Sequence, residues 1–135
     1  MLKSKKELKI LMKKVLLIED EPALVDLYKA KFSKEGFDVI VAFDGESGLQ
    51  LARTEKPDFI ILDILLPVRN GIAFLKKLRA EPEISKIPVF VFSCFDEQDI
   101  KKQAYDLGIE DYVLKTKYTP DQLVKEIKSY QSVTK

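Results

Sequence analysis

Five short apolar runs, each followed by a helix-like segment, are the feature that most restricts how this sequence folds. The runs are rich in branched and aromatic residues, and most lack polar alternation, which is typical of strands buried on both faces. Repeated β-α units of this size predict an α/β fold, a doubly wound parallel sheet with helices on both faces. The five predicted strands are Val15–Ile18, Val39–Val41, Phe59–Leu62, Val89–Phe92 and Tyr112–Leu114.

The ends of the predicted helices carry recognisable boundary residues. Pro22 suits the first turn of the first helix, and Gly36 suits the position just after its end. Aspartate and asparagine can accept hydrogen bonds from the free N–H groups at a helix start. The other predicted boundaries are Asp44, Asn70 and Asp96 as caps of the second, third and fourth helices, Gly108 as the end of the fourth, and a capping box at 119–122 for the fifth.

The composition excludes several classes of protein. The chain has no histidine, so an imidazole base, an imidazole metal ligand and a phosphohistidine are all absent from it. Its single cysteine, Cys94, cannot form an internal disulfide. No apolar run is long enough to span a bilayer, and lysines interrupt the first apolar residues where a secretory signal would lie. These features predict a cytoplasmic protein without membrane insertion.

The net charge of +1 is unevenly distributed along the chain. Residues 1–14 contain six lysines and one glutamate, a net charge of +5, so the remaining residues carry about −4. An acidic body argues against broad nucleic-acid binding by the domain itself. The basic start of the chain could contact nucleic acid or an anionic membrane, but a solvated tail or a first helical turn is the favoured interpretation.

Polar and charged residues stand where four of the five predicted strands end. Glu19 and Asp20 follow the first strand, Asp63 the third, Ser93 the fourth and Lys115 the fifth. Ligands of open α/β sheets bind at this carboxyl edge. Clustered carboxylates favour a hard cation such as Mg²⁺, and an aspartate beside that charge can accept a phosphoryl group. The acids would repel the phosphates of a flavin or nucleotide bound after the first strand.

The motifs that carry these residues resemble the receiver domain of two-component response regulators, a chemotaxis-type (CheY-like) domain. The resemblance implies a flavodoxin-like sheet of strand order 2-1-3-4-5, a basic extension at 1–13, a receiver domain at 14–131 and a tail at 132–135. It also implies a stand-alone module, because only 131–135 follow the last predicted helix. The matching motifs are Val15–Pro22, Ile61–Pro67 with Asn70–Gly71, Phe92–Ser93 and Gly108–Lys115.

The family's functional roles, carried over by this resemblance, fall on seven positions and imply Mg²⁺ as cofactor. The expected roles are Asp63 as phosphoacceptor, Asp20, Asp63 and the Leu65 carbonyl as metal ligands, Glu19 as a ligand through water, Lys115 as the phosphate-binding lysine, and Ser93 and Tyr112 as the switch pair. Phosphorylation of Asp63 by a phosphohistidine on a sensor kinase or phosphotransfer protein would switch protein–protein binding. The output surface would be the fourth helix, fifth strand and fifth helix, and no enzymatic turnover of a separate substrate is expected.

Four positions depart from the usual family pattern, one of them being Glu19, which stands where aspartate is commoner. Thr116 follows Lys115 where proline is usual, Cys94 replaces a smaller residue, and Arg69 stands where an apolar residue is frequent. Leu65 and Phe95 lie two residues beyond the acceptor and the hydroxyl, at positions that influence hydrolysis in family members. Neither side chain can orient an attacking water, so one interpretation is that the domain loses its phosphoryl group slowly. The other interpretation is that both side chains only pack on the loops.

Two alternative functions compete with the phosphorylated switch. A receiver-fold interaction module acting without phosphorylation is compatible with Thr116 and Cys94, although the acids, Ser93 and Lys115 argue against it. A haloacid-dehalogenase-like phosphatase would use Asp63 as nucleophile but needs a second aspartate two positions later, where Leu65 stands.

Overall fold

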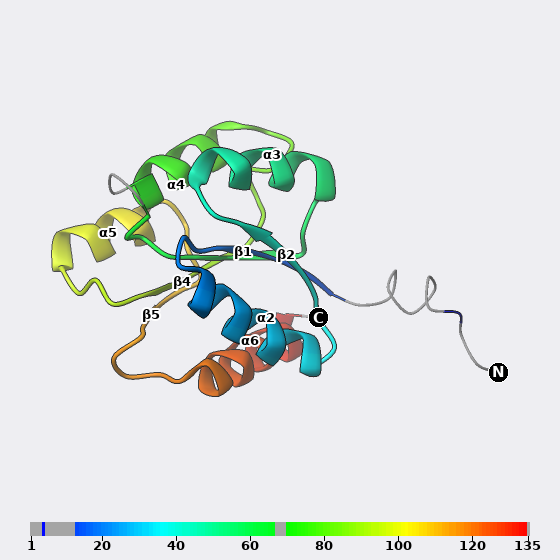
Figure 1. The fold of residues 1–135 in the computed structure, drawn as a ribbon. Coiled ribbons are helices and arrows are strands. Elements are labelled where there is room, and N and C mark those ends of the chain that lie inside the picture. Colours follow the sequence, from blue (N-terminus) through cyan, green and yellow to red (C-terminus); the bar gives the residue numbers. More distant parts are fainter. Residues whose placement is uncertain (1–3, 5–12, 67–69, 135) are drawn as a thin grey trace.

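The computed structural model describes residue 4, residues 13–66 and residues 70–134, with the side chains of residues 70 and 131–134 left out of the description. The described part of the chain therefore excludes most of the basic extension, Pro67, Arg69 and the predicted helix cap at Asn70. The five strands form one parallel sheet of order β2-β1-β3-β4-β5, which confirms the fold prediction (Figure 1). The strands are β1 (Lys14–Ile18), β2 (Asp38–Ala42), β3 (Phe59–Leu62), β4 (Val89–Ser93) and β5 (Asp111–Leu114).

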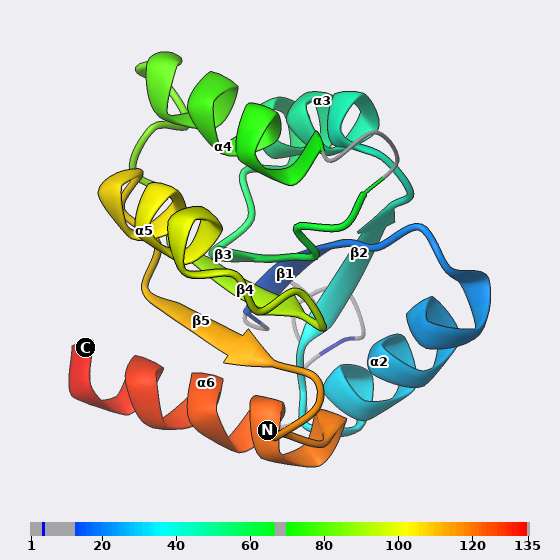
Figure 2. The same cartoon turned by 90° about the vertical axis from the view of Figure 1, so that its left-hand side faces the viewer.

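Helices cover both faces of the sheet. Helices α3, α4 and α5 lie on one side, and α2 and α6 lie together on the other (Figures 1 and 2). Helix α6 continues beyond residue 131, where the domain was expected to end. The helices are α2 (Pro22–Lys34), α3 (Gly45–Glu55), α4 (Asn70–Ala80), α5 (Gln98–Asp106) and α6 (Pro120–Thr134).

Successive side chains of the central strands enter two separate cores. In β1, Leu16 and Ile18 pack under α3 and α4, whereas Val15 and Leu17 pack under α2 and α6. Because both faces are covered, every position of such a strand is apolar, and the sequence shows a continuous run. The continuous runs of β3 and β4 have the same cause.

Aromatic rings in edge-to-face contact dominate the core beneath α2 and α6. Phe59 on β3 is central to this row, with ring centroids 5.6 Å from Phe37 and 6.0 Å from Phe90. Phe32 and Tyr130 extend the row at centroid distances of 5.5 Å and 5.1 Å. Edge-to-face pairs add to the burial energy of the rings.

Most of the predicted helix boundaries are confirmed. Asp44 accepts a hydrogen bond from the Ser47 backbone N–H at 2.8 Å. Gly36 and Gly108 follow the ends of α2 and α5 with φ of +89° and +77°, a region that favours glycine. The capping box is reciprocal, since the N–H of Thr119 donates to the Gln122 side chain at 2.8 Å and the N–H of Gln122 to the Thr119 hydroxyl at 3.2 Å.

The predicted cap of the fourth helix is wrong. Helix α5 begins at Gln98, one residue later than a cap at Asp96 requires, and its first residue follows Glu97, which makes no side-chain capping bond. The Asp96 carboxylate instead forms an ion pair with Lys101. A local cation on the same helix has therefore replaced the N–H groups as the partner of Asp96.

Candidate functional site

The strand ladder continues into the residues that follow the strands. The backbone N–H of Asp63 donates to the Ile18 carbonyl at 3.1 Å, and the N–H of Glu19 donates to the Ala42 carbonyl at 3.1 Å. The N–H of Lys115 donates to the Ser93 carbonyl at 2.9 Å. These bonds fix each of the three backbones at the carboxyl edge of the sheet, as the sequence predicts for a parallel arrangement.

Lys115 lies between two buried carboxylates. Its ammonium nitrogen is 2.7 Å from Glu19 Oε1 and 2.9 Å from Asp63 Oδ2. The side chains are 11% exposed for Lys115, 3% for Glu19 and 9% for Asp63, so water screens the cluster little. Two acids share one amine, which leaves the ionised cluster with a net negative charge and a capacity for further cations.

Burial and charge act in opposite directions on the ionisation of this cluster. Burial alone would lower the pKa of Lys115, but the hydrogen bond with Glu19 and the charge of Asp63 outweigh it and raise this pKa above its ordinary value. Burial raises the pKa of Glu19, and the hydrogen bond from Lys115 only partly offsets that rise. The amine therefore stays protonated at neutral pH.

Backbone N–H groups hold both carboxylates in place. Glu19 Oε2 accepts from the N–H of Asp20 at 3.1 Å and from that of Glu21 at 3.4 Å. Asp63 Oδ1 accepts from the N–H of Leu65 at 2.9 Å. In the described part of the chain, no buried polar side-chain atom lacks a hydrogen-bond partner. The acids are thus oriented by the loops that follow their own strands.

Ser93 and Tyr112 both bind the loop after β4. The fully buried Ser93 hydroxyl accepts from the N–H of Phe95 at 3.2 Å, and the Tyr112 hydroxyl donates to the Phe95 carbonyl at 2.6 Å. Burial raises the pKa of Tyr112 to about 12, against the opposing effect of a hydrogen bond with Ser93. The phenol is therefore a proton donor at neutral pH, and both hydroxyls contact the backbone of Phe95.

The remaining predicted metal ligands stand at the mouth of the site. Asp20 is exposed and Leu65 is 41% exposed. No group of three acidic, cysteine or histidine side chains in the described residues is arranged to hold a metal ion by itself. Mg²⁺ commonly uses only one or two carboxylates and retains several waters. The oxygen-only donors Asp20, Asp63 and the Leu65 carbonyl therefore fit this ion chemically.

Sequence reasoning missed two features of the site. It expected Glu19 to act through water on a metal, whereas the structure also pairs Glu19 directly with Lys115. It also assigned no role at the site to the rings of Tyr28 and Phe92, although both rings lie beside the Lys115 ammonium. The available signal was a tyrosine hydroxyl in the otherwise apolar stripe of the first helix, about two helical turns beyond the acidic motif.

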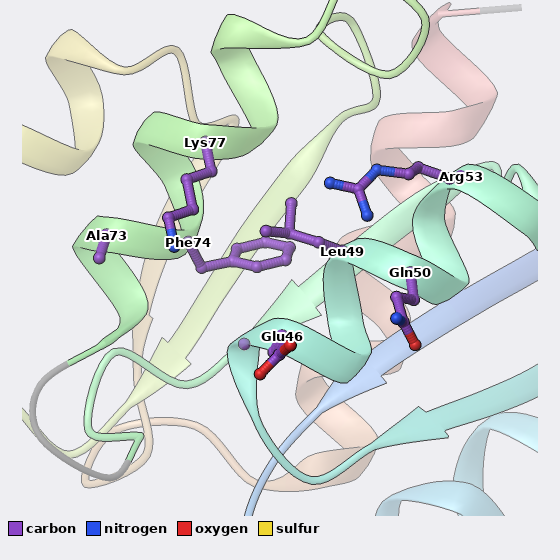
Figure 3. Close-up of a pocket in the computed structure, with 8 residues that line it drawn as sticks. Glu46, Leu49, Gln50, Arg53, Ala73, Phe74 and Lys77 are labelled. Atoms are coloured by element: carbon purple, nitrogen blue, oxygen red, sulfur yellow. The ribbon is translucent and has the colours of Figure 1, made fainter.

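A separate groove between α3 and α4 contains none of the predicted site residues (Figure 3). It has a volume of about 500 Å³, and Leu49 and Phe74 form its floor while Glu46 and Lys77 stand at its walls. At one end, the Arg53 guanidinium pairs with Glu81 through two nitrogens. The chemistry expected from the strand ends therefore lies outside this hollow.

Comparison with known families identifies the family of this chain. Residues 15–128 match the response regulator receiver domain, and this span includes each predicted site residue and the five strands except Lys14, the first residue of β1. The chain belongs to the response regulator receiver family. Receiver domains are phosphoacceptors of two-component signalling that pair with histidine kinases, and they are not enzymes acting on a separate substrate.

Individual receiver proteins show the same relationship. The alkaline phosphatase synthesis transcriptional regulatory protein PhoP of Bacillus subtilis (strain 168) is 37% identical over 117 residues, 87% of this chain and 48% of that protein. The chain thus spans about half the length of that relative. The crystal structure of the phosphorylated cyanobacterial phytochrome response regulator RcpA is 27% identical, with a TM-score of 0.75 and coverage of 89% of this chain and 91% of that chain.

A metal-bound receiver is also similar. The crystal structure of the Mn(2+)-bound form of response regulator Rcp1 is 25% identical, with a TM-score of 0.75 and coverage of 88% of this chain and 94% of that chain. The receiver family typically binds a divalent metal. The oxygen donors at the carboxyl edge of this receiver are of the type that such a metal prefers.

Proposed function

We propose that this receiver is a phosphorylation switch in which Asp63 accepts a phosphoryl group from a phosphohistidine donor. The observation that supports it most is the direct contact of Lys115 with both Asp63 and Glu19 at the buried carboxyl edge. An aspartate beside a fixed positive charge is suited to phosphoryl transfer, which depends mainly on positioning and charge neutralisation. The phosphorylated state of the similar RcpA structure supports the same chemistry.

The proposed transfer is an in-line displacement at phosphorus. An oxygen of Asp63 forms the new P–O bond while the P–N bond of the donor phosphohistidine breaks, and the imidazole leaves. The Lys115 ammonium neutralises charge on the phosphoryl oxygens, and the Ser93 hydroxyl donates a hydrogen bond to one of them. Asp20, Asp63, the Leu65 carbonyl and, through water, Glu19 would hold Mg²⁺. This ion, when bound, supplies further positive charge.

The output of the switch follows from the contacts of Ser93. Its hydroxyl now accepts from the Phe95 N–H, in the same loop that holds the Tyr112 hydroxyl. A movement of the Ser93 oxygen toward a phosphoryl oxygen would lengthen the hydrogen bond that it accepts from this loop, which leads into α5. We therefore assign output to a downstream protein that binds the surface of α5, β5 and α6. Among the described helices, none has the length and apolar character needed to cross a membrane.

Acetyl phosphate with Mg²⁺ provides the direct test of the proposed function. We expect intact-mass measurement to show one added phosphoryl group on the wild-type receiver. Asp63→Asn keeps an oxygen that can accept from the Leu65 N–H but lacks the nucleophile, so this variant should gain no mass. Chelation of Mg²⁺ should also abolish the wild-type reaction.

An unmodified wild-type chain in that experiment would contradict the phosphorylation proposal. The receiver would then act as a binding module without phosphorylation, the alternative that Thr116 and Cys94 leave open. Equal modification of Asp63→Asn would instead place the phosphoryl group on another residue. Circular dichroism of both proteins serves as the folding control.

Slow loss of the phosphoryl group is a second expected property. Leu65 is exposed beside Asp63 and Phe95 lies half-buried, and neither side chain offers a hydrogen bond to an attacking water. We expect Leu65→Asn, which supplies such a group, to shorten the phosphoryl half-life by about tenfold, equivalent to ~1.4 kcal/mol in the barrier. Intact mass followed over time after removal of acetyl phosphate measures the decay.

Leu27→Asn is the matched control for that substitution. Leu27 is 42% exposed, close to the 41% of Leu65, but it lies on helix α2 away from the loop after Asp63. Its phosphoryl half-life should equal that of the wild type. Decay of the wild-type phosphoprotein within seconds would refute the expected slow loss. It would show that water attacks the phosphoryl group although neither Leu65 nor Phe95 can orient it.

A further inference from the structure

Two aromatic rings stand beside the ammonium group of Lys115. The Lys115 nitrogen is 5.7 Å from the ring centroid of Tyr28 and 5.8 Å from that of Phe92. The rings contact each other edge to face, with centroids 5.5 Å apart and an interplanar angle of 61°. Both distances lie within the range of a cation–π interaction. The lysine therefore meets two π-systems in addition to its two carboxylates.

Both rings are immobilised by their position in the fold. Tyr28 is 3% exposed on α2 and Phe92 is 2% exposed on β4, and both belong to the core beneath α2 and α6. Burial raises the pKa of Tyr28, the charge of Lys115 opposes this rise, and the charges of Glu19 and Asp63 add to it. The Tyr28 side chain is thus in electrostatic reach of all three charged groups of the site.

The segment after Lys115 offers less restraint than the rings do. Thr116 follows Lys115, so the backbone there lacks the fixed φ angle of a proline. A lysine side chain also has four rotatable bonds and loses much conformational freedom when it is held in one place. Buried rings at the end of the side chain limit where its ammonium can go.

We propose that Tyr28 and Phe92 form an aromatic cradle that positions the Lys115 ammonium for a phosphoryl group on Asp63. This proposal rests on the proposed function, since it assigns Tyr28 and Phe92 as positioning residues for that reaction. A cation–π contact depends less on direction than a hydrogen bond does, so the ammonium can shift over the rings without losing it. Lys115 can therefore exchange a carboxylate oxygen for a phosphoryl oxygen while it keeps both ring contacts.

The first test observes the lysine without any phosphorylation. The ¹⁵N-labelled ammonium signal of Lys115, assigned by its disappearance in Lys115→Arg, reports how firmly the group is held against exchange with water. We expect Tyr28→Leu and Phe92→Leu to broaden or abolish this signal, and Tyr28→Phe, which keeps the ring, to retain it. Phe32→Leu is the matched control, because Phe32 is a buried aromatic residue of the same helix that packs on Phe37.

The second test measures the affinity for beryllofluoride in the presence of Mg²⁺ by ¹⁹F NMR. Tyr28→Leu should weaken binding about threefold to tenfold, the range expected for loss of a partly buried cation–π contact. Tyr28→Phe should bind like the wild type. In a Lys115→Ala background, Tyr28→Leu should cause no further loss, because the cradle acts only through the lysine.

The possible outcomes separate the cradle from the phosphorylation proposal. A folded Tyr28→Leu protein that retains the Lys115 signal overturns the cradle, as does an equal loss of signal or affinity in Phe32→Leu. An additive loss in the Lys115→Ala background also overturns it. If the wild type binds no beryllofluoride, the proposed function fails at this site, and the ammonium signal alone then decides whether the rings hold Lys115.

Discussion

Lys115→Met is expected to lower the free energy of unfolding by about 3 kcal/mol at pH 7, the size typical of breaking a buried ion pair from one side. The substitution leaves Glu19 and Asp63 buried side by side without their shared cation. Backbone N–H groups still bind both acids, but they do not neutralise two negative charges. Urea unfolding followed by circular dichroism measures the loss.

The deficit of Lys115→Met should depend on pH in a defined direction. The pKa of Lys115 is raised in the folded protein, so its stabilisation is fully present below the ordinary value of 10.5 and is lost as pH rises through the folded value. Burial raises the pKa of Glu19, so ionised Glu19 costs stability above its folded pKa. The variant should therefore approach the wild type in acid, where Glu19 is protonated, and again in strong alkali, where Lys115 is neutral.

A second substitution in the same cluster provides the control for this charge argument. Adding Glu19→Gln to Lys115→Met removes one of the two unpaired charges and should restore part of the lost stability. Lys101→Met is a matched change elsewhere, since Lys101 pairs with the exposed Asp96 and should cost far less. A Lys115→Met deficit that stays constant between pH 4 and pH 7 would show that lost packing, rather than charge, is its cause.

Phe59→Ala is expected to lower the free energy of unfolding by about 3–5 kcal/mol. Phe59 is 2% exposed on the central strand β3, and its ring contacts Phe37 and Phe90 edge to face. Close-packed neighbours on the sheet cannot collapse fully into the space of a missing ring. The cost therefore includes both the lost burial and the cavity, measured as a lower midpoint of urea unfolding.

Phe43→Ala removes the same atoms from a solvent-exposed position. Phe43 is 48% exposed just after β2, so its truncation should change the unfolding midpoint little. Equal midpoints for the two variants would contradict the cavity argument. Near-native beryllofluoride binding by folded Phe59→Ala would further show that the ring stabilises the fold without touching the site.

The strands and the edge that holds the site could be predicted from local patterns. Runs such as Phe59–Leu62 are apolar at every position because both faces of the sheet are covered, and such runs differ plainly from amphipathic helices. The parallel order then brings the residues after each strand to one edge. Glu19, Asp63 and Lys115 meet there because the ladder fixes their backbones.

The details that could not be predicted depend on side chains distant in sequence. Asp96 has the sequence signature of a helix cap. Whether its carboxylate binds the free N–H groups of α5 or the Lys101 ammonium depends on the course of the loop before the helix. Tyr28 and Phe92 reach Lys115 from α2 and β4, and no spacing rule connects these segments. Local propensity specifies the elements, whereas the contacts between elements depend on tertiary packing.

The two ion pairs of Lys115 join residues that lie far apart in the sequence, and this separation affects how the chain folds during synthesis. Lys115 is separated from Glu19 by 96 residues and from Asp63 by 52. On the ribosome both acids emerge well before their cation, and closing such long loops is slow. A nascent chain that ends before β5 therefore has an uncompensated acidic edge, and the last strand must dock before Lys115 can offset part of this negative charge.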